Sequence, residues 1–304
     1  MILIPLVASA CLIEITGVDE PRKREATEAF VRSVPILGQT AARVEGLNGT
    51  IRITGLSGLD AVSVQATKRV RSRSFRDAEW HLDDLEVRVW TLSTEIRIET
   101  IQPLHDADRE YIVDYEILVP DDLDLVVVNG NGDLVIEDLR AQVDLKVGNG
   151  NVRTRGFVGT GLVEVGNGSL DVAMVLPEGG EIVLLDGNGT VTLALQPDVS
   201  AELEAQVGNG TISVSGFDMT NHVSAPHLVR STLGDGDGRI VVSVGNGTIR
   251  IEPGPFLTAR AETTPWTRAR AGAYVVVHAP EAPGAPATPL GRHGSSGPAQ
   301  TLTG

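Results

Sequence analysis

Short runs in which apolar and polar residues alternate cover much of this chain. Residues 43–53 form the first clear run, and further runs follow at 62–64, 85–89, 95–98 and 111–117. Because successive side chains of a β-strand point to opposite faces, a period of two predicts strands with one buried face. From residue 121 onward the runs become regular and resemble one another.

The tripeptide Gly-Asn-Gly punctuates these regular runs. It is centred on Asn131, Asn149, Asn167, Asn188, Asn209 and Asn246. A simpler Asn-Gly stands at Asn48. The first five centres lie 18, 18, 21 and 21 residues apart, and a fixed period near 20 residues predicts an array of stacked units. We therefore interpret these asparagines as structural turn residues.

Aligning the repeats on this tripeptide predicts which side chains are buried. Apolar residues fall one, three and five positions before the first glycine, and two and four positions after the second. These positions share one face of a strand. Asn129, Asp186 and Thr154 interrupt the pattern, and we expect them near coil corners or at an end of the array.

Two topologies can use this pattern. Asn-Gly between alternating apolar residues favours a tight hairpin, and successive hairpins would build an antiparallel β meander or sandwich. The near-constant period favours instead an all-β, right-handed parallel β-helix or β-solenoid with coils of 18–21 residues. In that arrangement glycine and asparagine would tolerate left-handed backbone at each corner.

The single cysteine, Cys11, follows an apolar run that ends in the small residues Ala8, Ser9 and Ala10. This N-terminus resembles a bacterial lipoprotein signal peptide, in which the cysteine becomes lipidated. The run has no Lys or Arg after Met1, and Ala8 stands where leucine is commoner. The alternative is a short buried strand with an ordinary core cysteine. We expect lipidation at Cys11 and a membrane partner reached through that anchor.

Shifts in composition divide the chain into five segments. These are a signal peptide (1–10), a lipid-anchored tether (11–40), an irregular β region (41–120), the regular β-solenoid repeats (121–253) and a mostly disordered tail rich in Pro, Gly and Ala (254–304). An excursion from Phe217 to Gly234 stretches one repeat spacing from 21 to 37 residues.

Charge and composition narrow the function. The net charge of -15 and the isoelectric point near 4.8 argue against a nucleic-acid partner, because duplex binding requires clustered Lys and Arg. Aromatic residues make up 4% of the chain, so its core must consist mainly of Val, Ile and Leu. Stacked β-coils can fill a narrow interior in this way.

Few residues point to chemistry. The sequence has no nucleophile elbow, zinc-protease motif or phosphate-binding loop, and we expect neither an enzyme nor a cofactor. Asp235 and Asp237 are weak candidates for calcium, which prefers several hard oxygen ligands. His222 and His227, with Asp218 nearby, are still weaker candidates for another metal.

Three passages together resemble a known family. They are residues 44–55 (VEGLNGTIRITG), residues 113–120 (VDYEILVP) and residues 233–236 (LGDG) with the final Gly-Asn-Gly strand. This order is similar to the bacterial "putative adhesin" family of envelope proteins, over about residues 40–253. The resemblance implies a protein of the cell envelope. Together with the repeats, Cys11 and the missing catalytic motifs, it leads us to expect a non-enzymatic, lipid-anchored protein, at the outer membrane, that binds a surface glycan or protein. The alternatives are a scaffold that self-associates through its coil ends and a polysaccharide-active enzyme.

Overall fold

The computed structural model describes residues 24–103 and 108–254. The elements of these residues are β1 (Arg24–Pro35), β2 (Ala41–Asn48), β3 (Ile51–Leu56), β4 (Ala61–Ser72), α1 (Phe75–Trp80), β5 (Glu86–Thr91), β6 (Glu95–Ile101), β7 (Glu110–Pro120), β8 (Asp124–Asn131), β9 (Leu134–Glu137), β10 (Gln142–Val158), β11 (Thr160–Val175), β12 (Glu181–Leu195), β13 (Ala201–Val214), β14 (Met219–Ala225), β15 (Leu228–Leu233) and β16 (Gly238–Pro253). The segments predicted as a signal peptide (1–10) and as a tail (254–304, apart from Gly254) fall outside the described residues.

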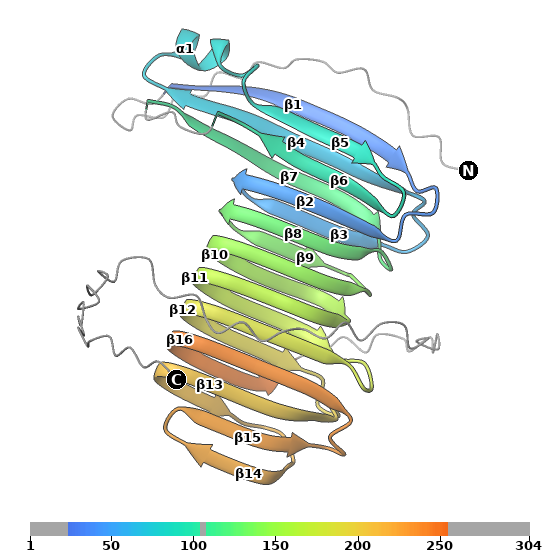
Figure 1. Ribbon diagram of the computed structural model, residues 1–304, viewed down its shortest axis with the longest axis vertical. Coiled ribbons are helices and arrows are strands. Elements are labelled where there is room, and N and C mark those ends of the chain that lie inside the picture. Colours follow the sequence, from blue (N-terminus) through green and yellow to red (C-terminus); the bar gives the residue numbers. More distant parts are fainter. Residues whose placement is uncertain (1–23, 104–107, 255–304) are drawn as a thin grey trace, which may run out of the picture.

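The strands form one long mixed sheet that is not closed (Figure 1). Its main path runs β1-β4-β7-β3-β9-β10-β11-β12-β16-β13-β15-β14. The strands of the Gly-Asn-Gly repeats pair in parallel, whereas both ends of the path pair antiparallel. The all-β class is therefore confirmed. An antiparallel meander is not the arrangement of the repeats.

Each regular repeat is a strand with two limbs, one before its Gly-Asn-Gly and one after it. The repeats align asparagine on asparagine, as in the pairs Asn149↔Asn167 and Asn167↔Asn188. Because neighbouring repeats pair in this register, residues at equivalent positions of the repeats form rows along the stack. We call the part of each strand before the tripeptide its first limb and the part after it its second limb.

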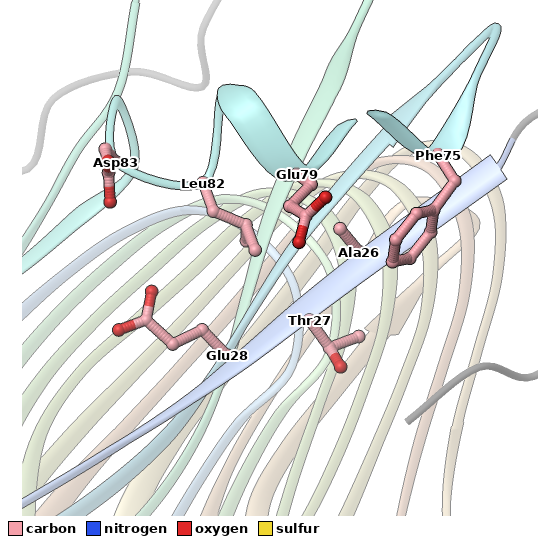
Figure 2. Close-up of a pocket in the computed structure, with 7 residues that line it drawn as sticks. All are labelled: Ala26, Thr27, Glu28, Phe75, Glu79, Leu82 and Asp83. Atoms are coloured by element: carbon pink, nitrogen blue, oxygen red, sulfur yellow. The ribbon is translucent and has the colours of Figure 1, made fainter. Parts of the chain in front are cut away.

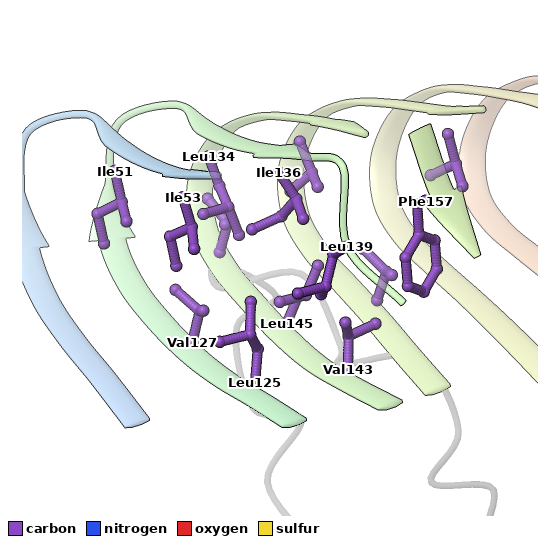
Figure 3. Close-up of a cluster of buried hydrophobic side chains, with 14 of the residues drawn as sticks. Ile51, Ile53, Leu125, Val127, Leu134, Ile136, Leu139, Val143, Leu145 and Phe157 are labelled. Carbon is purple, nitrogen blue, oxygen red and sulfur yellow. The ribbon is translucent and has the colours of Figure 1, made fainter. Parts of the chain in front are cut away.

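The core lies between the two limbs (Figure 3). Leu125, Val127 and Leu145 of the first limb face Ile51, Leu134 and Ile136 of the second limb, and all six are at most 1% exposed. The alternation read from the sequence predicted these buried positions. Aliphatic side chains fill this narrow interior, in agreement with the low aromatic content.

Among the strands that carry the Gly-Asn-Gly repeats, one departs from chain order. β16, the last strand of the described chain, lies between β12 and β13 and pairs in parallel with both. The Phe217–Gly234 excursion contains the hairpin of β14 and β15, and β15 pairs antiparallel with the first limb of β13. Alignment of the repeats gave no indication that the final repeat returns to an inner position.

The N-terminal part of the stack is more irregular. β1 pairs antiparallel with β4 along its whole length, so residues 24–35 belong to the sheet instead of the tether expected over residues 11–40. β2 and β3 carry the Asn48 repeat and pair in parallel with β8 and β9. The irregular region therefore continues the same stack as the regular repeats.

Candidate binding surfaces

The seven turn asparagines form one continuous ladder of side-chain amides along the stack. Each Nδ2 donates to the Oδ1 of the neighbouring asparagine, over 2.8–2.9 Å at every step. The spatial order is Asn48, Asn131, Asn149, Asn167, Asn188, Asn246 and Asn209. Hydrogen bonds in such chains polarise one another and strengthen cooperatively. The ladder binds coil to coil, in keeping with a structural role for these residues.

The ladder has a direction. At the β2 end, the Asn48 amide donates to the backbone oxygen of Tyr111 over 3.2 Å. At the other end, Asn209 donates to Asn246. All the amide dipoles of the ladder therefore point the same way.

The glycines are required because neighbouring backbones approach closely at the bend. A Cβ on Gly168 would lie 1.8 Å from the backbone oxygen of Gly150, and one on Gly148 would lie 2.5 Å from that of Gly130. The second glycine of every repeat except Gly189 also has positive φ, for example 144° at Gly150. The asparagines do not have positive φ, so the expected left-handed asparagine was wrong. Their side chains explain their presence instead.

Two polar side chains are buried in the first-limb core, in the same row of the stack. Asn129 is aligned through Val147 and Val165 with Asp186, and both polar residues are 2% exposed. Asn129 donates from Nδ2 to the backbone oxygens of Gly49 at 2.9 Å and Gly132 at 3.3 Å. It thus satisfies two carbonyl groups beside the bend.

Neither carboxyl oxygen of Asp186 forms a well-aligned hydrogen bond, although the Asn188 backbone N–H lies near enough to influence the carboxyl group. Its Oδ2 and the Gly168 backbone oxygen both lie close to the same point above Gly189, 2.7 and 1.5 Å from where a Cβ would stand. Burial raises the pKa of Asp186 to about 6, and the Asn188 backbone N–H offsets part of that rise. The break in the apolar pattern marks this residue in the sequence, but not its burial.

Thr154, the third exception to the pattern, is also buried. Its Oγ1 donates to the Ala173 backbone oxygen at 3.2 Å and accepts from the Ala173 N–H at 3.1 Å. The register between β10 and β11 shifts just beyond it. Thr154 therefore supplies hydrogen bonds where the ladder of backbone bonds is interrupted.

The candidate calcium residues are tied into a loop. Ser200 accepts hydrogen bonds at Oγ from the backbone N–H groups of Asp235 and Asp237, and donates to the Asp237 carboxylate at 2.8 Å. His222 and His227 are exposed. Within the described residues, no group of three His, Cys, Asp or Glu side chains is placed to hold a metal ion. Turn formation accounts for this loop.

The outer faces carry charges that pair across neighbouring coils. Lys146 lies 3.0 Å from Glu164, and Arg153 lies 3.2 Å from Asp171. Polysaccharide hydrolysis needs two carboxyl groups at a fixed separation with different pKa values, and these carboxylates instead face cations. Such exposed pairs contribute little stability individually.

A shallow recess of about 210 Å³ lies between β1 and α1 (Figure 2). Ala26 of β1 and, from the opposite side, Phe75 and Leu82 give it an apolar lining, and Glu28, Glu79 and Asp83 also border it. Glu28 is engaged by Lys68 at 2.6 Å. The recess therefore combines an apolar lining with carboxylates, which would suit a small cationic ligand with an apolar part.

The helix beside this recess is held by one carboxylate. Asp77 of α1 accepts from Arg109 over 2.8 and 2.9 Å and from the Ser72 hydroxyl. These hydrogen bonds, with Arg109 the stronger influence, lower the pKa of Asp77 to about 2. The lining of the recess is therefore fixed relative to β4 and to the start of β7.

Cys11 lies outside the described residues, so its lipidation stays a prediction. Among the described residues, no helix is both long and apolar enough to cross a membrane.

No protein-family model and no curated protein matches the chain. Solved structures similar to it include a putative cell adhesion protein from Clostridium sporogenes, at 15% identity and a TM-score of 0.41, covering 75% of this chain and 100% of that one. Another is a putative adhesin from Bacteroides fragilis, at 13% identity and a TM-score of 0.32, covering 74% and 97%. A third is a putative lipid binding protein from Parabacteroides distasonis, at 8% identity and a TM-score of 0.24, covering 73% and 96%. The first two names agree with the family that the sequence resembles, although likeness at this level does not assign a function.

Proposed function

We propose that this protein is a non-enzymatic adhesin of the cell envelope, built as a parallel β-solenoid and anchored through a lipid on Cys11. The observation that carries the proposal is the continuous stack with distinct ends. The asparagine ladder joins coils from β2 to β13, while the chain enters the described structure through β1 at the opposite end from β13 (Figure 1).

Such a stack acts as a rigid spacer. The main path of the sheet from β1 to β13 places ten strands side by side. At ~4.8 Å between neighbouring strands, this part of the stack is roughly 45 Å long. An anchor at Cys11 would hold the β1 end near a membrane, at the outer membrane in our proposal, and carry the β13 end away from it. The ligand in this proposal is a glycan or protein on another surface.

The charge distribution is compatible with this orientation. Lys and Arg balance Asp and Glu at eleven each in residues 24–103, whereas residues 108–254 carry 8 basic and 23 acidic side chains. Residues 108–120, which include β7 beside β4, hold four of these acidic residues, and residues 121–254 hold the other 19 with 7 basic ones. Most of the excess negative charge therefore lies in the part of the stack that would point away from the anionic membrane surface.

Metabolic labelling with a fatty-acid probe tests the anchor. We expect the full chain to incorporate label and to fractionate with the envelope, and Cys11→Ser to lose both. Adhesion of cells that express either form to surfaces coated with envelope glycans or proteins tests the binding role. Equal labelling of the two forms would exclude the anchor, and equal adhesion of expressing and non-expressing cells would exclude the adhesin.

A further inference from the structure

Within the described part of the chain, the second limb of β13 leaves one strand edge open. Residues Asn209–Val214 pair with β16 on one side, whereas β15 covers only the first limb, from Ala201 to Gln206. Ile212 and Val214 are partly exposed, although the equivalent Ile249 and Ile251 of β16 are 0% exposed. The apolar interior is thus incompletely covered at this edge.

The direction of the hydrogen bonds identifies the unpaired groups. In a β-strand the N–H and C=O of one residue point to the same side, and successive residues alternate between the two sides. The Ser215 N–H donates to the Ile251 oxygen, so the backbone groups of the odd-numbered residues of this limb point toward β16. The N–H and C=O groups of Gly210, Ile212 and Val214 therefore point away from the stack.

Other edges of the described sheet carry features that discourage pairing. β14 is interrupted by a register shift between Thr220 and Val223, with Asn221 at φ 50°. β1 carries Arg24, Glu25, Glu28 and Arg32 and ends at Pro35. Bulges, charges and proline are the usual protection of an edge strand, and Gly210–Val214 has none of them.

The open edge is also neutral. No charged residue occurs from Asn209 to Phe217, in a chain whose net charge is -15. Two copies of so acidic a chain repel each other wherever charged surfaces meet, so a neutral surface is where a second copy can approach most closely. The three residues with free backbone groups, moreover, are placed symmetrically about Ile212, so the edge is complementary to itself in an antiparallel arrangement.

We infer that this edge pairs antiparallel with the same edge of a second copy, with Ile212 on the two-fold axis. Ile212 then faces Ile212, and Gly210 faces Val214, so that each of the three residues exchanges its N–H and C=O with a partner. Thr211 stands opposite Ser213 on the outer face. Ile212 and Val214 of both copies complete one apolar interior across the junction.

This pairing would specify the ligand of the proposed adhesin, and its role between cells rests on that proposed function. In the dimer the two β1 ends point away from each other, so copies anchored through Cys11 meet from two facing surfaces. The partner of this adhesin is then the same protein on another cell. One short strand pair is weak, but many copies on each surface act together and raise the avidity.

Paired cysteines test the register in the full chain carrying Cys11→Ser. Thr211 and Ser213 of opposite copies form a non-hydrogen-bonded pair with Cα atoms ~4.5 Å apart, within reach of a disulfide. We expect a mixture of Thr211→Cys and Ser213→Cys proteins to cross-link at least tenfold more than either protein alone, since like positions lie ~7–8 Å apart. Equal cross-linking of the single proteins, or none in the mixture, would overturn the register.

Bead clustering tests the pairing between surfaces. Beads that display the full chain through its N-terminus should cluster, and Val214→Pro should abolish clustering because it removes an N–H that is unpaired within one copy. Val214→Ala keeps this N–H and is the matched control. Circular dichroism checks that each variant folds. If Val214→Pro does not fold, Ile212→Pro serves as the second blocking variant. Beads that adhere to cells but do not cluster with one another would overturn the inference and leave the adhesin function standing.

Discussion

Asp186 occupies in β12 the position that Asn129 occupies in β8, yet it has a carboxyl where Asn129 has a hydrogen-bond donor. An ionised carboxylate beside the Gly168 oxygen cannot donate, whereas the protonated acid can. Burial accounts for the pKa near 6, since it outweighs the opposing influence of the Asn188 backbone N–H. Protonation of Asp186 would therefore supply one of the two kinds of hydrogen bond that Asn129 donates.

We predict that Asp186 makes the free energy of unfolding depend on pH between about 4 and 6. Its pKa is higher in the folded chain than the ordinary 3.8, so the folded state binds the proton more tightly than the unfolded state. Its contribution is full below about pH 4 and is lost as pH rises through about 6, by up to about 3 kcal/mol.

Asp186→Asn provides the comparison. At pH 7 the variant should unfold at a higher urea concentration than the natural chain, and the difference should shrink as pH falls to 4. Taking the difference between the two proteins removes the contributions of the other carboxylates. A difference that is the same at pH 7 and pH 4 would contradict the prediction.

A second prediction concerns the close approach at the bend. Gly168→Ala should lower the free energy of unfolding by more than about 3 kcal/mol, because the new Cβ would overlap the Gly150 oxygen at 1.8 Å and φ is 150°. Gly179→Ala is the control. It also has positive φ, at 67°, but its Cβ would meet nothing within 4 Å, so it should cost about 1 kcal/mol. Urea unfolding of both variants checks this, and similar losses would mean that backbone strain alone explains the glycines.

The asparagine ladder should be more sensitive in its middle than at its end. Asn167 both donates to Asn149 and accepts from Asn188, whereas Asn209 forms a single ladder bond with Asn246. At about 1 kcal/mol per hydrogen bond, Asn167→Ala should cost about 2 kcal/mol and Asn209→Ala about 1 kcal/mol. Thermal unfolding would show the order, and a larger loss at Asn209 would argue against a ladder that acts as a unit.

The inserted strand gives a further prediction. A chain that ends at Leu233 lacks β16, so β13 loses its parallel partner and the β12 edge becomes open. Amide hydrogen exchange should then lose protection in β12, β13 and β15 and keep it in β8 and β10. A chain that ends at Gly254 retains β16 and is the control. Unchanged protection in β13 of the shorter chain would show that β13 is held by other contacts.

The alternation of residues specified much of the fold. It identified the strands and the buried face, since a period of two is a local property that packing follows directly. It did not reveal the place of β16, because Asn246 is as compatible with Asn188 and Asn209 as with an outer position. Order within a repetitive stack depends on chain connections, and identical rungs carry no information about it.

The candidate site was less accessible to sequence reasoning. The uncharged run from Asn209 to Phe217 is visible in the sequence. Its importance depends on the pairing of β15 with β13 reaching only as far as the Leu228–Gln206 pair, which leaves the second limb of β13 uncovered. Asp186 was visible as an exception to the apolar pattern, whereas its lack of well-aligned hydrogen bonds depends on the neutral rows around it. Both features arise from neighbours distant in sequence.

The inner position of β16 also limits how the chain can change its length during evolution. Coils from β10 to β12 follow one another in both sequence and space, so duplication of an 18-residue unit there would lengthen the rod by one rung and leave both ends intact. A unit added after β13 would have to leave β16 in its place between β12 and β13. Relatives of different reach should therefore differ in the number of middle coils and share the same distal end.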